Sequence, residues 1–305
     1  MEATFRKHKR SLFFKQRLMG YVFLLPTAVL FLIFTVVPFI MAFYLSFFEY
    51  NLLEVGEFVG FEYYSTAFSN TEFMKSFLNI LIYAVMYVPS IIIISLLAAV
   101  LGNSELFGSK AMRIIFYLPC ITGSIATAYV WRWMFDVDSG VFNGILGMFG
   151  LPESQWLSSR SYLVMVCVVM VSVWSGIGNN MLIFLAALKG VSPELYEAAK
   201  LDGANKMQTL WYITVPSIAP TMYFITTMSI IGAFQMFDLV YAMVPSNSME
   251  WGRTPVVMIY EIGFTRFRGG LGTAMSIILF AVIMIVTFLF LSLIHISEPT
   301  RLQLI

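Results

Sequence analysis

The sequence predicts an all-α, polytopic membrane protein with six transmembrane helices, and two observations carry this prediction. Of the 305 residues, 59% are hydrophobic and only 11% are charged, whereas soluble domains carry about 25% charged residues. In addition, six segments are long and apolar enough to cross the roughly 30 Å hydrocarbon core of a bilayer as helices. These segments are 19–47, 77–101, 112–135, 161–187, 217–243 and 272–294.

The distribution of lysine and arginine predicts the orientation of these helices, because basic loops stay in the cytoplasm. If the basic tail 1–18 is cytoplasmic, eleven lysines and arginines lie inside and six lie outside. Arg266 and Arg268 run against this bias. Both termini are therefore expected in the cytoplasm, with several crossings of the membrane between them.

Several functions are disfavoured by what the chain lacks. A net charge of +1 gives no general attraction to nucleic acid. Cys120, Cys167 and the two histidines form neither a disulfide framework, nor a metal-ligand pattern, nor a catalytic triad. No phosphate-binding loop of the form GxxxxGK[ST] is present, so ATP is not expected to bind this chain. We expect a non-catalytic protein without a cofactor or metal of its own.

One polar segment, 189–216, interrupts the apolar pattern and predicts a helix–turn–helix between the fourth and fifth spans. Ser192 can cap a helix whose first residue is Pro193. Asp202-Gly203 is expected to end that helix, because glycine adopts the left-handed conformation at little cost. Residues 204–212 then suit a second short helix.

The residues alone leave two interpretations of this segment open. A hairpin with one apolar side can lie on the lipid headgroups, or it can dock into a cytoplasmic partner. The small residues Ala198, Ala199 and Gly203 favour close approach to protein, since a helix that faces lipid prefers larger apolar side chains.

A resemblance to a known family decides between them. The runs Glu197-Ala198-Ala199, Asp202-Gly203-Ala204 and Ile213-Thr214-Val215-Pro216 closely resemble the EAA loop of ABC importer permeases. Elsewhere, Phe58-Val59-Gly60-Phe61 and Gly232-Ala233-Phe234-Gln235 resemble the sugar-type permeases, and the likeness extends over residues 18–290.

The resemblance implies the type I ABC importer permease fold, a place in the inner membrane of a bacterial cell, and a subunit that moves a sugar or oligosaccharide delivered by an extracellular solute-binding protein. It implies as further partners a second permease subunit and an ATPase dimer that holds ATP-Mg. It also implies that the loop couples the spans to the ATPase. The coupling residues would be Glu197, Ala198, Ala199, Asp202 and Gly203.

Polar groups at membrane depth mark candidates for the substrate path, because such groups are costly there and usually face a cavity. Amides and carboxylates bind sugar hydroxyls, and aromatic faces cover sugar C–H surfaces. The candidates are Asn180, Gln235, Asp238, Trp174 and Phe234. The alternative is that the polar ones only form hydrogen bonds between helices.

The C-terminal residues 291–305 depart from the family pattern. The run LSLIHISEPTR resembles the translation of a sequencing-library adapter, so we expect this tail to be non-native and carry no function. Three other protein classes remain as rivals, namely an ion-driven transporter, a structural membrane protein and a membrane enzyme. An ion-driven transporter needs buried ionisable relays and usually internal repeats, and the sequence shows no such pattern. A membrane enzyme needs a catalytic constellation, and the sequence shows none. Which sugar is carried is not encoded in any recognisable motif.

Overall fold

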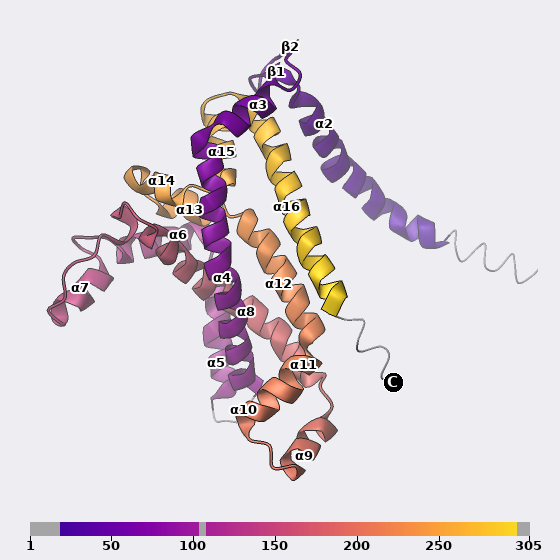
Figure 1. The fold of residues 1–305 in the computed structure, drawn as a ribbon, viewed down its shortest axis with the longest axis vertical. Helices are drawn as coiled ribbons and strands as arrows, with labels where there is room; N and C mark the ends of the chain where they lie inside the picture. Colours follow the sequence, from indigo (N-terminus) through magenta and orange to yellow (C-terminus); the bar gives the residue numbers. More distant parts are fainter. Residues whose placement is uncertain (1–18, 104–107, 298–305) are drawn as a thin grey trace, which may run out of the picture. The chain divides into compact units, whose positions relative to one another are not determined.

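The computed structural model describes residues 19–103 and 108–297. The predicted basic tail 1–18 and residues 298–305 of the predicted adapter-like tail lie outside this part of the chain. The described residues form helices almost throughout, as predicted, with one small β-hairpin (Figure 1). The described residues fall into two compact units, one within 19–66 and 262–277 and the other within 67–261 and 278–297.

Among the described residues, four helices are long and apolar enough to cross a membrane, and two bent pairs bring the total to six if each pair counts as one span. The first, Met19–Leu45, includes a π-helical turn, η1 (Leu32–Val36), before α2 (Val37–Leu45). The others are α4 (Thr71–Asn103), α8 (Leu163–Lys189) and α16 (Gly269–Ser297). Four of the predicted segments therefore correspond to continuous helices.

The predicted third span, 112–135, is not one straight helix. α5 (Ser109–Tyr117) continues into a 3-10 turn, η2 (Leu118–Ile121), and α6 (Ser124–Met134) then leaves at 100° to this direction. Pro119 lacks the N–H that a continuous helix would need, and Gly123 adopts an extended ψ of 137°. The two residues break the helix in the middle of the apolar segment.

The predicted fifth span, 217–243, differs at both ends. Its helix begins earlier, with α10 (Lys206–Thr209), the π-helical η4 (Leu210–Thr214) and α11 (Val215–Ser217), and bends by 72° before α12 (Ala219–Phe234). Pro220 at the start of α12 provides no N–H to continue the preceding turn. The helix ends at Phe234, so 235–243 forms a turn and the short α13 (Asp238–Met243).

In the first unit, a β-hairpin follows the first span. β1 (Phe48–Tyr50) pairs antiparallel with β2 (Val55–Phe58), and α3 (Glu62–Ser69) begins directly after it. The start of α16 packs tightly here, since a Cβ on Gly270 would lie 2.4 Å from the Phe48 carbonyl oxygen. Gly269 and Gly270 therefore permit an approach that a side chain would block.

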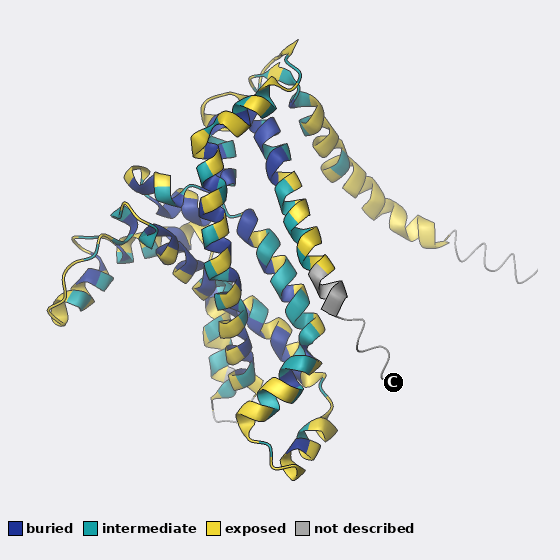
Figure 2. Ribbon diagram, viewed as in Figure 1, coloured by how far each residue is buried: buried dark blue, intermediate teal, exposed yellow. Residues whose placement is uncertain are grey.

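In the second unit, α4 packs along α8 and forms the core with α12. The large side chains buried there include Tyr83, Ile91, Met181 and Phe184, and Figure 2 shows buried residues along both helices. The remaining elements are α7 (Val141–Met148), η3 (Trp156–Ser158), η5 (Ser246–Ser248), α14 (Met249–Gly252), α15 (Pro255–Tyr260) and the π-helical η6 (Glu261–Thr265), the last of which continues into the first unit.

Candidate functional site: the loop hairpin and the α12–α13 pocket

The predicted helix–turn–helix is present, and its first helix begins where the sequence predicts. α9 (Pro193–Leu201) has Ser192 as its N-cap, whose hydroxyl oxygen accepts a hydrogen bond from the Glu194 N–H at 3.3 Å. Pro193 occupies the first helical position, where its missing N–H leaves nothing unpaired. The N-terminus is thus fixed by adjacent residues.

The turn that ends α9 is a Schellman motif. Gly203 adopts a φ of +76°, which glycine tolerates far better than other residues. Its N–H donates to the Lys200 carbonyl at 3.1 Å, and the Ala204 N–H donates to the Ala199 carbonyl at 2.9 Å. The predicted helix stop at Asp202-Gly203 is confirmed.

The second helix begins at Lys206, two residues later than the predicted start at Ala204. Asn205 and Gln208 form a capping box: the Asn205 side chain accepts from the Gln208 N–H at 2.9 Å, and the Gln208 side chain accepts from the Asn205 N–H at 2.8 Å. The spacing Asn-x-x-Gln is the signal that would have located this start.

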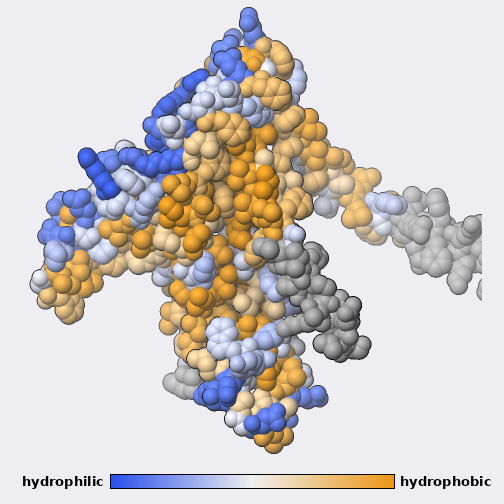
Figure 3. Space-filling view, in the orientation of Figure 1, coloured by the Kyte–Doolittle hydropathy of each residue, from blue (hydrophilic) through white to orange (hydrophobic). Residues whose placement is uncertain are grey.

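The predicted coupling residues divide by exposure. Glu197, Ala198, Asp202 and Gly203 are exposed, whereas Ala199 is only 4% exposed and packs within the chain. Beside them Leu201 is 89% exposed. The Tyr196 hydroxyl lies 3.3 Å from the Thr214 hydroxyl and joins α9 to η4. Figure 3 shows hydrophilic and hydrophobic surface mixed over this hairpin, and mainly hydrophobic surface over the long helices.

Two of the predicted substrate-path residues, Gln235 and Asp238, line a pocket of about 370 Å³ beside the turn that joins α12 to α13. Asp238 accepts a hydrogen bond on Oδ2 from the Ser124 hydroxyl of α6 at 3.0 Å. Tyr87 of α4 and Phe237 add aromatic rings to the wall. The pocket thus combines a carboxylate, an amide, hydroxyls and ring faces.

The other three candidates do not line this pocket. Phe234 is only 4% exposed and belongs to the core. The Asn180 amide donates to the Gly176 carbonyl of its own helix at 3.1 Å. The Trp174 ring stands edge-on to Trp131 at 5.4 Å, with 38% of the residue exposed.

Sequence reasoning did not select Tyr87, Ser124, Ser172 and Ser175 as lining residues, and they reach the pocket from three different helices. The Ser175 hydroxyl is buried and has no hydrogen-bond partner among the described residues. Its backbone carbonyl accepts from the Cys120 thiol at 3.0 Å. Isolated serines in apolar helices carry no sequence signal that separates them from packing residues.

Gly178 lets α8 approach the broken third segment closely. A Cβ on Gly178 would lie 2.5 Å from the Phe116 carbonyl oxygen, 2.7 Å from the Tyr117 Cα and 2.8 Å from the Cys120 sulfur. The broken third segment therefore touches α8 backbone to backbone. This contact joins α8 to α5 and η2, whereas the glycines that line the pocket are Gly176 and Gly232.

A second group of polar residues lies around the N-terminal end of α4. The Lys75 amino group is 2.5 Å from a Glu250 carboxylate oxygen, and Arg253 pairs with Glu72 at 2.7 Å and with Glu261 at 3.4 Å. The hydrogen bond and positive charge of Lys75 lower the pKa of Glu250. Among the described residues no group of three or more potential ligands is placed to hold a metal ion.

The described residues form helices long and apolar enough to cross a membrane, with an exposed helical hairpin between two of them, and comparison with known proteins gives the family. The model of the binding-protein-dependent transport system inner membrane component matches residues 64–300, and the chain belongs to that family. It is the non-catalytic transmembrane permease of an ABC importer that works with a binding protein.

Curated relatives cover nearly the whole chain. The arabinooligosaccharides transport system permease protein AraP of Bacillus subtilis is 33% identical over 93% of this chain and 91% of its own length. The diacetylchitobiose uptake system permease protein NgcF of Streptomyces coelicolor is 30% identical over 92% of this chain and 83% of its own.

A solved structure supports the fold. The chain resembles a chain of a bacterial ABC transporter involved in the import of the acidic polysaccharide alginate, with a TM-score of 0.78 and 24% identity over 92% of this chain and 96% of that one. The predicted permease fold is therefore confirmed.

Proposed function

We propose that this chain forms one half of the membrane path of an importer for a short oligosaccharide, with both termini in the cytoplasm and with ATP-Mg held by an ATPase dimer. A second permease subunit and an extracellular solute-binding protein complete the assembly. The names of the relatives support the substrate class, since AraP is named for arabinooligosaccharides and NgcF for diacetylchitobiose.

The α9–α10 hairpin is the observation that carries the coupling role. It projects Glu197, Ala198, Asp202 and Gly203 to the surface on a turn whose shape is fixed by its own hydrogen bonds. A rigid, exposed hairpin with small residues suits docking into a cleft of a partner. It also passes a movement of that partner on to the membrane helices better than a flexible loop would. In this role Ala199 supports the hairpin from inside.

The pocket lined by Gln235 and Asp238 suits the substrate path. A carboxylate and an amide bind hydroxyl groups, and the rings of Tyr87 and Phe237 offer faces to the C–H surface of a sugar. Asp238 already accepts from Ser124 with one oxygen, which leaves acceptor capacity for a ligand.

Co-purification tests the coupling role most directly. The chain is expressed with its partner permease and ATPase, and Glu197→Lys is compared with Glu153→Lys, an exposed charge reversal in the loop before α8, at the opposite end of that helix. We expect Glu197→Lys to retain membrane insertion but lose at least tenfold in ATPase recovered and in uptake, while the control stays normal. Normal recovery and uptake for Glu197→Lys would refute the coupling role.

A further inference from the structure

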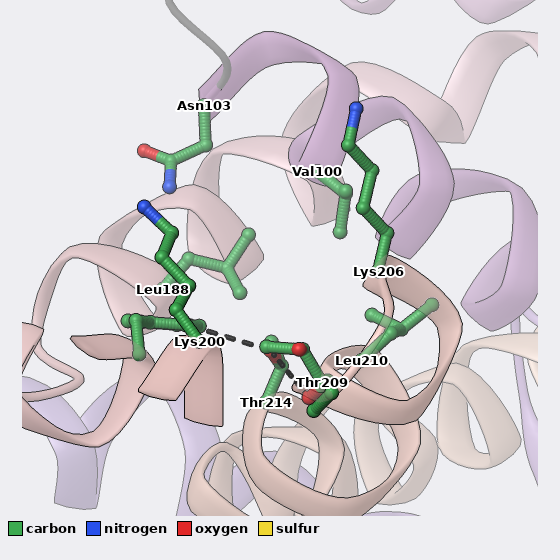
Figure 4. A pocket seen from close by; sticks show the side chains of 10 residues that line it. Val100, Asn103, Leu188, Lys200, Lys206, Thr209, Leu210 and Thr214 are labelled. Atoms are coloured by element: carbon green, nitrogen blue, oxygen red, sulfur yellow. Dashed lines mark hydrogen bonds between the residues drawn. The ribbon is translucent and has the colours of Figure 1, made fainter. Parts of the chain in front are cut away.

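A second pocket, of about 320 Å³, lies where α4 and α8 end and the hairpin begins (Figure 4). Val100 and Asn103 come from the last turns of α4, and Leu188 from the last turn of α8. α4 has 33 residues and α8 has 27, lengths of roughly 50 and 40 Å at 1.5 Å per residue. Both exceed the roughly 30 Å hydrocarbon core, so their ends reach the headgroup layer.

The pocket has an apolar floor and a basic rim. Leu188, Leu210 and Val100 line the floor, and Lys200 and Lys206 contribute amino groups. In Figure 4 both amino groups point toward the side on which Asn103 lies, away from Thr214. The lining thus offers apolar contact and two positive charges on neighbouring elements.

These two positive charges are not neutralised within the described residues. The three ion pairs there involve Lys75 and Arg253, and none includes Lys200 or Lys206. A third cation stands beside the rim, because the Arg113 guanidinium donates to the Gly102 carbonyl, one residue before Asn103, and pairs with no carboxylate among the described residues. A neutral carbonyl partner leaves the charge of that guanidinium in place.

We propose that this pocket binds the phosphate of an anionic phospholipid, with the glycerol and the first acyl carbons on the apolar floor. Basic pockets between membrane helices at the cytoplasmic side suit such headgroups, and the volume lies in the range of small-molecule sites. The cytoplasmic side rests on the orientation proposed above. A lipid held here contacts Lys200 of α9 and the end of α4 together, and so ties the hairpin to the membrane surface.

Lipid counting tests the proposal. The purified full chain is reconstituted in nanodiscs of phosphatidylcholine with a minority of phosphatidylglycerol, and the phosphatidylglycerol retained per chain after release is measured by mass spectrometry. Each lysine near an anionic surface contributes roughly a fivefold change in affinity. We therefore expect Lys200→Gln/Lys206→Gln to bind roughly 25-fold more weakly, and Lys200→Arg/Lys206→Arg to retain binding. Lys189→Gln, an exposed lysine outside the pocket, is the matched control.

Three results would overturn the proposal. The first is equal phosphatidylglycerol retention by the natural chain and the glutamine double variant. The second is an equal loss in Lys189→Gln, which would indicate general surface charge. The third is thermal stabilisation by inorganic phosphate in pure phosphatidylcholine that depends on both lysines, with no phosphatidylglycerol retention, which would indicate a soluble ligand. None of these readouts uses the ATPase, so failure here is separate from failure of the coupling role.

Discussion

The hairpin and the α12–α13 pocket are built in opposite ways. Every hydrogen bond that shapes the hairpin turn joins residues within five positions of each other, as Ala204 to Ala199 and Gln208 to Asn205 do. The pocket instead depends on long-range pairs such as Ser124 and Asp238, which are 114 positions apart. The hairpin is therefore a local structure displayed on the surface, whereas the pocket exists only when the whole unit is packed.

This difference predicts how each region tolerates change. A substitution in the hairpin alters one turn and leaves the bundle folded, because the affected bonds are local and exposed. A substitution at the base of the pocket disturbs several helices together, because close-packed interiors transmit strain.

The largest effect is expected from Gly178→Ala. The new Cβ would meet the backbone of Phe116 and Tyr117 at 2.5 and 2.7 Å, and backbone moves aside less easily than a side chain. Overpacking of this kind costs roughly 1–3 kcal/mol or more, so we expect a large fall in the yield and melting temperature of purified protein. Gly232→Ala at the pocket edge is the control, since nothing lies within 4 Å of its Cβ position. Equal yields and melting temperatures for the two variants would show that the backbone at Phe116 and Tyr117 can move to accommodate the new Cβ.

Asp238→Asn comes next and acts on binding, not folding. Asparagine keeps the acceptor for Ser124 but removes the charge that strengthens a hydrogen bond to a sugar hydroxyl. Hydrogen bonds to charged groups contribute about 1.5–3 kcal/mol, so we expect the concentration for half-maximal uptake to rise about tenfold or more. Asp138→Asn, an exposed acid between α6 and α7, serves as the control. Unchanged uptake in Asp238→Asn would return this residue to a packing role.

Gly203 allows the hairpin itself to be tested. Open space surrounds its Cβ position, and its φ is +76°, so a substitution there meets strain and no clash. Left-handed backbone costs roughly 1–2 kcal/mol for ordinary residues. We expect Gly203→Val to lower coupled ATPase activity several-fold at normal expression, and Gly203→Asn to retain most of it, because asparagine tolerates this conformation. A loss of expression in Gly203→Val would contradict the view that the hairpin is a local structure.

The smallest effect is expected from Lys75→Met. Its pair with Glu250 joins residues 175 positions apart but is exposed, and exposed ion pairs contribute little. Lys75 lowers the pKa of Glu250 from its ordinary 4.5. The pair therefore stabilises the fold above pH 4.5 and loses this effect as the pH falls through the lowered pKa. We expect the melting temperature of Lys75→Met to be slightly below that of the natural chain at pH 7, and the difference to disappear in acid. A large difference at pH 7 would mean that the loss of stability depends on the sequence separation of the pair and not on its burial.

The sequence predicted what local chemistry determines. Ser192 as a cap and Gly203 as a stop follow from neighbouring residues, and both predictions are confirmed. The count of six spans is confirmed when each bent pair is taken as one span. The number of spans can be counted from apolar composition, because composition shows which segments suit lipid. It does not show the direction in which each helix runs.

Direction and tertiary contact could not be predicted in the same way. The 100° bend between η2 and α6 lies between Pro119 and the start of α6, and mean hydropathy does not register a change of direction. The sequence predicts Phe234 as a ring for a sugar, but packing buries it, whereas Ser175, which no sequence pattern distinguishes, lines the pocket. A polar or aromatic residue in an apolar run does not reveal which face of its helix meets a cavity.

The capping contacts of the hairpin have a consequence for how such a transporter changes through evolution. All of the bonds that shape the turn, and the Tyr196–Thr214 contact that anchors it, fall within one contiguous stretch of the gene, residues 192–214. A single recombination event can therefore exchange the segment proposed to dock on the ATPase and leave the proposed substrate pocket unchanged. Under this proposal, the choice of ATPase and the choice of substrate can be inherited separately.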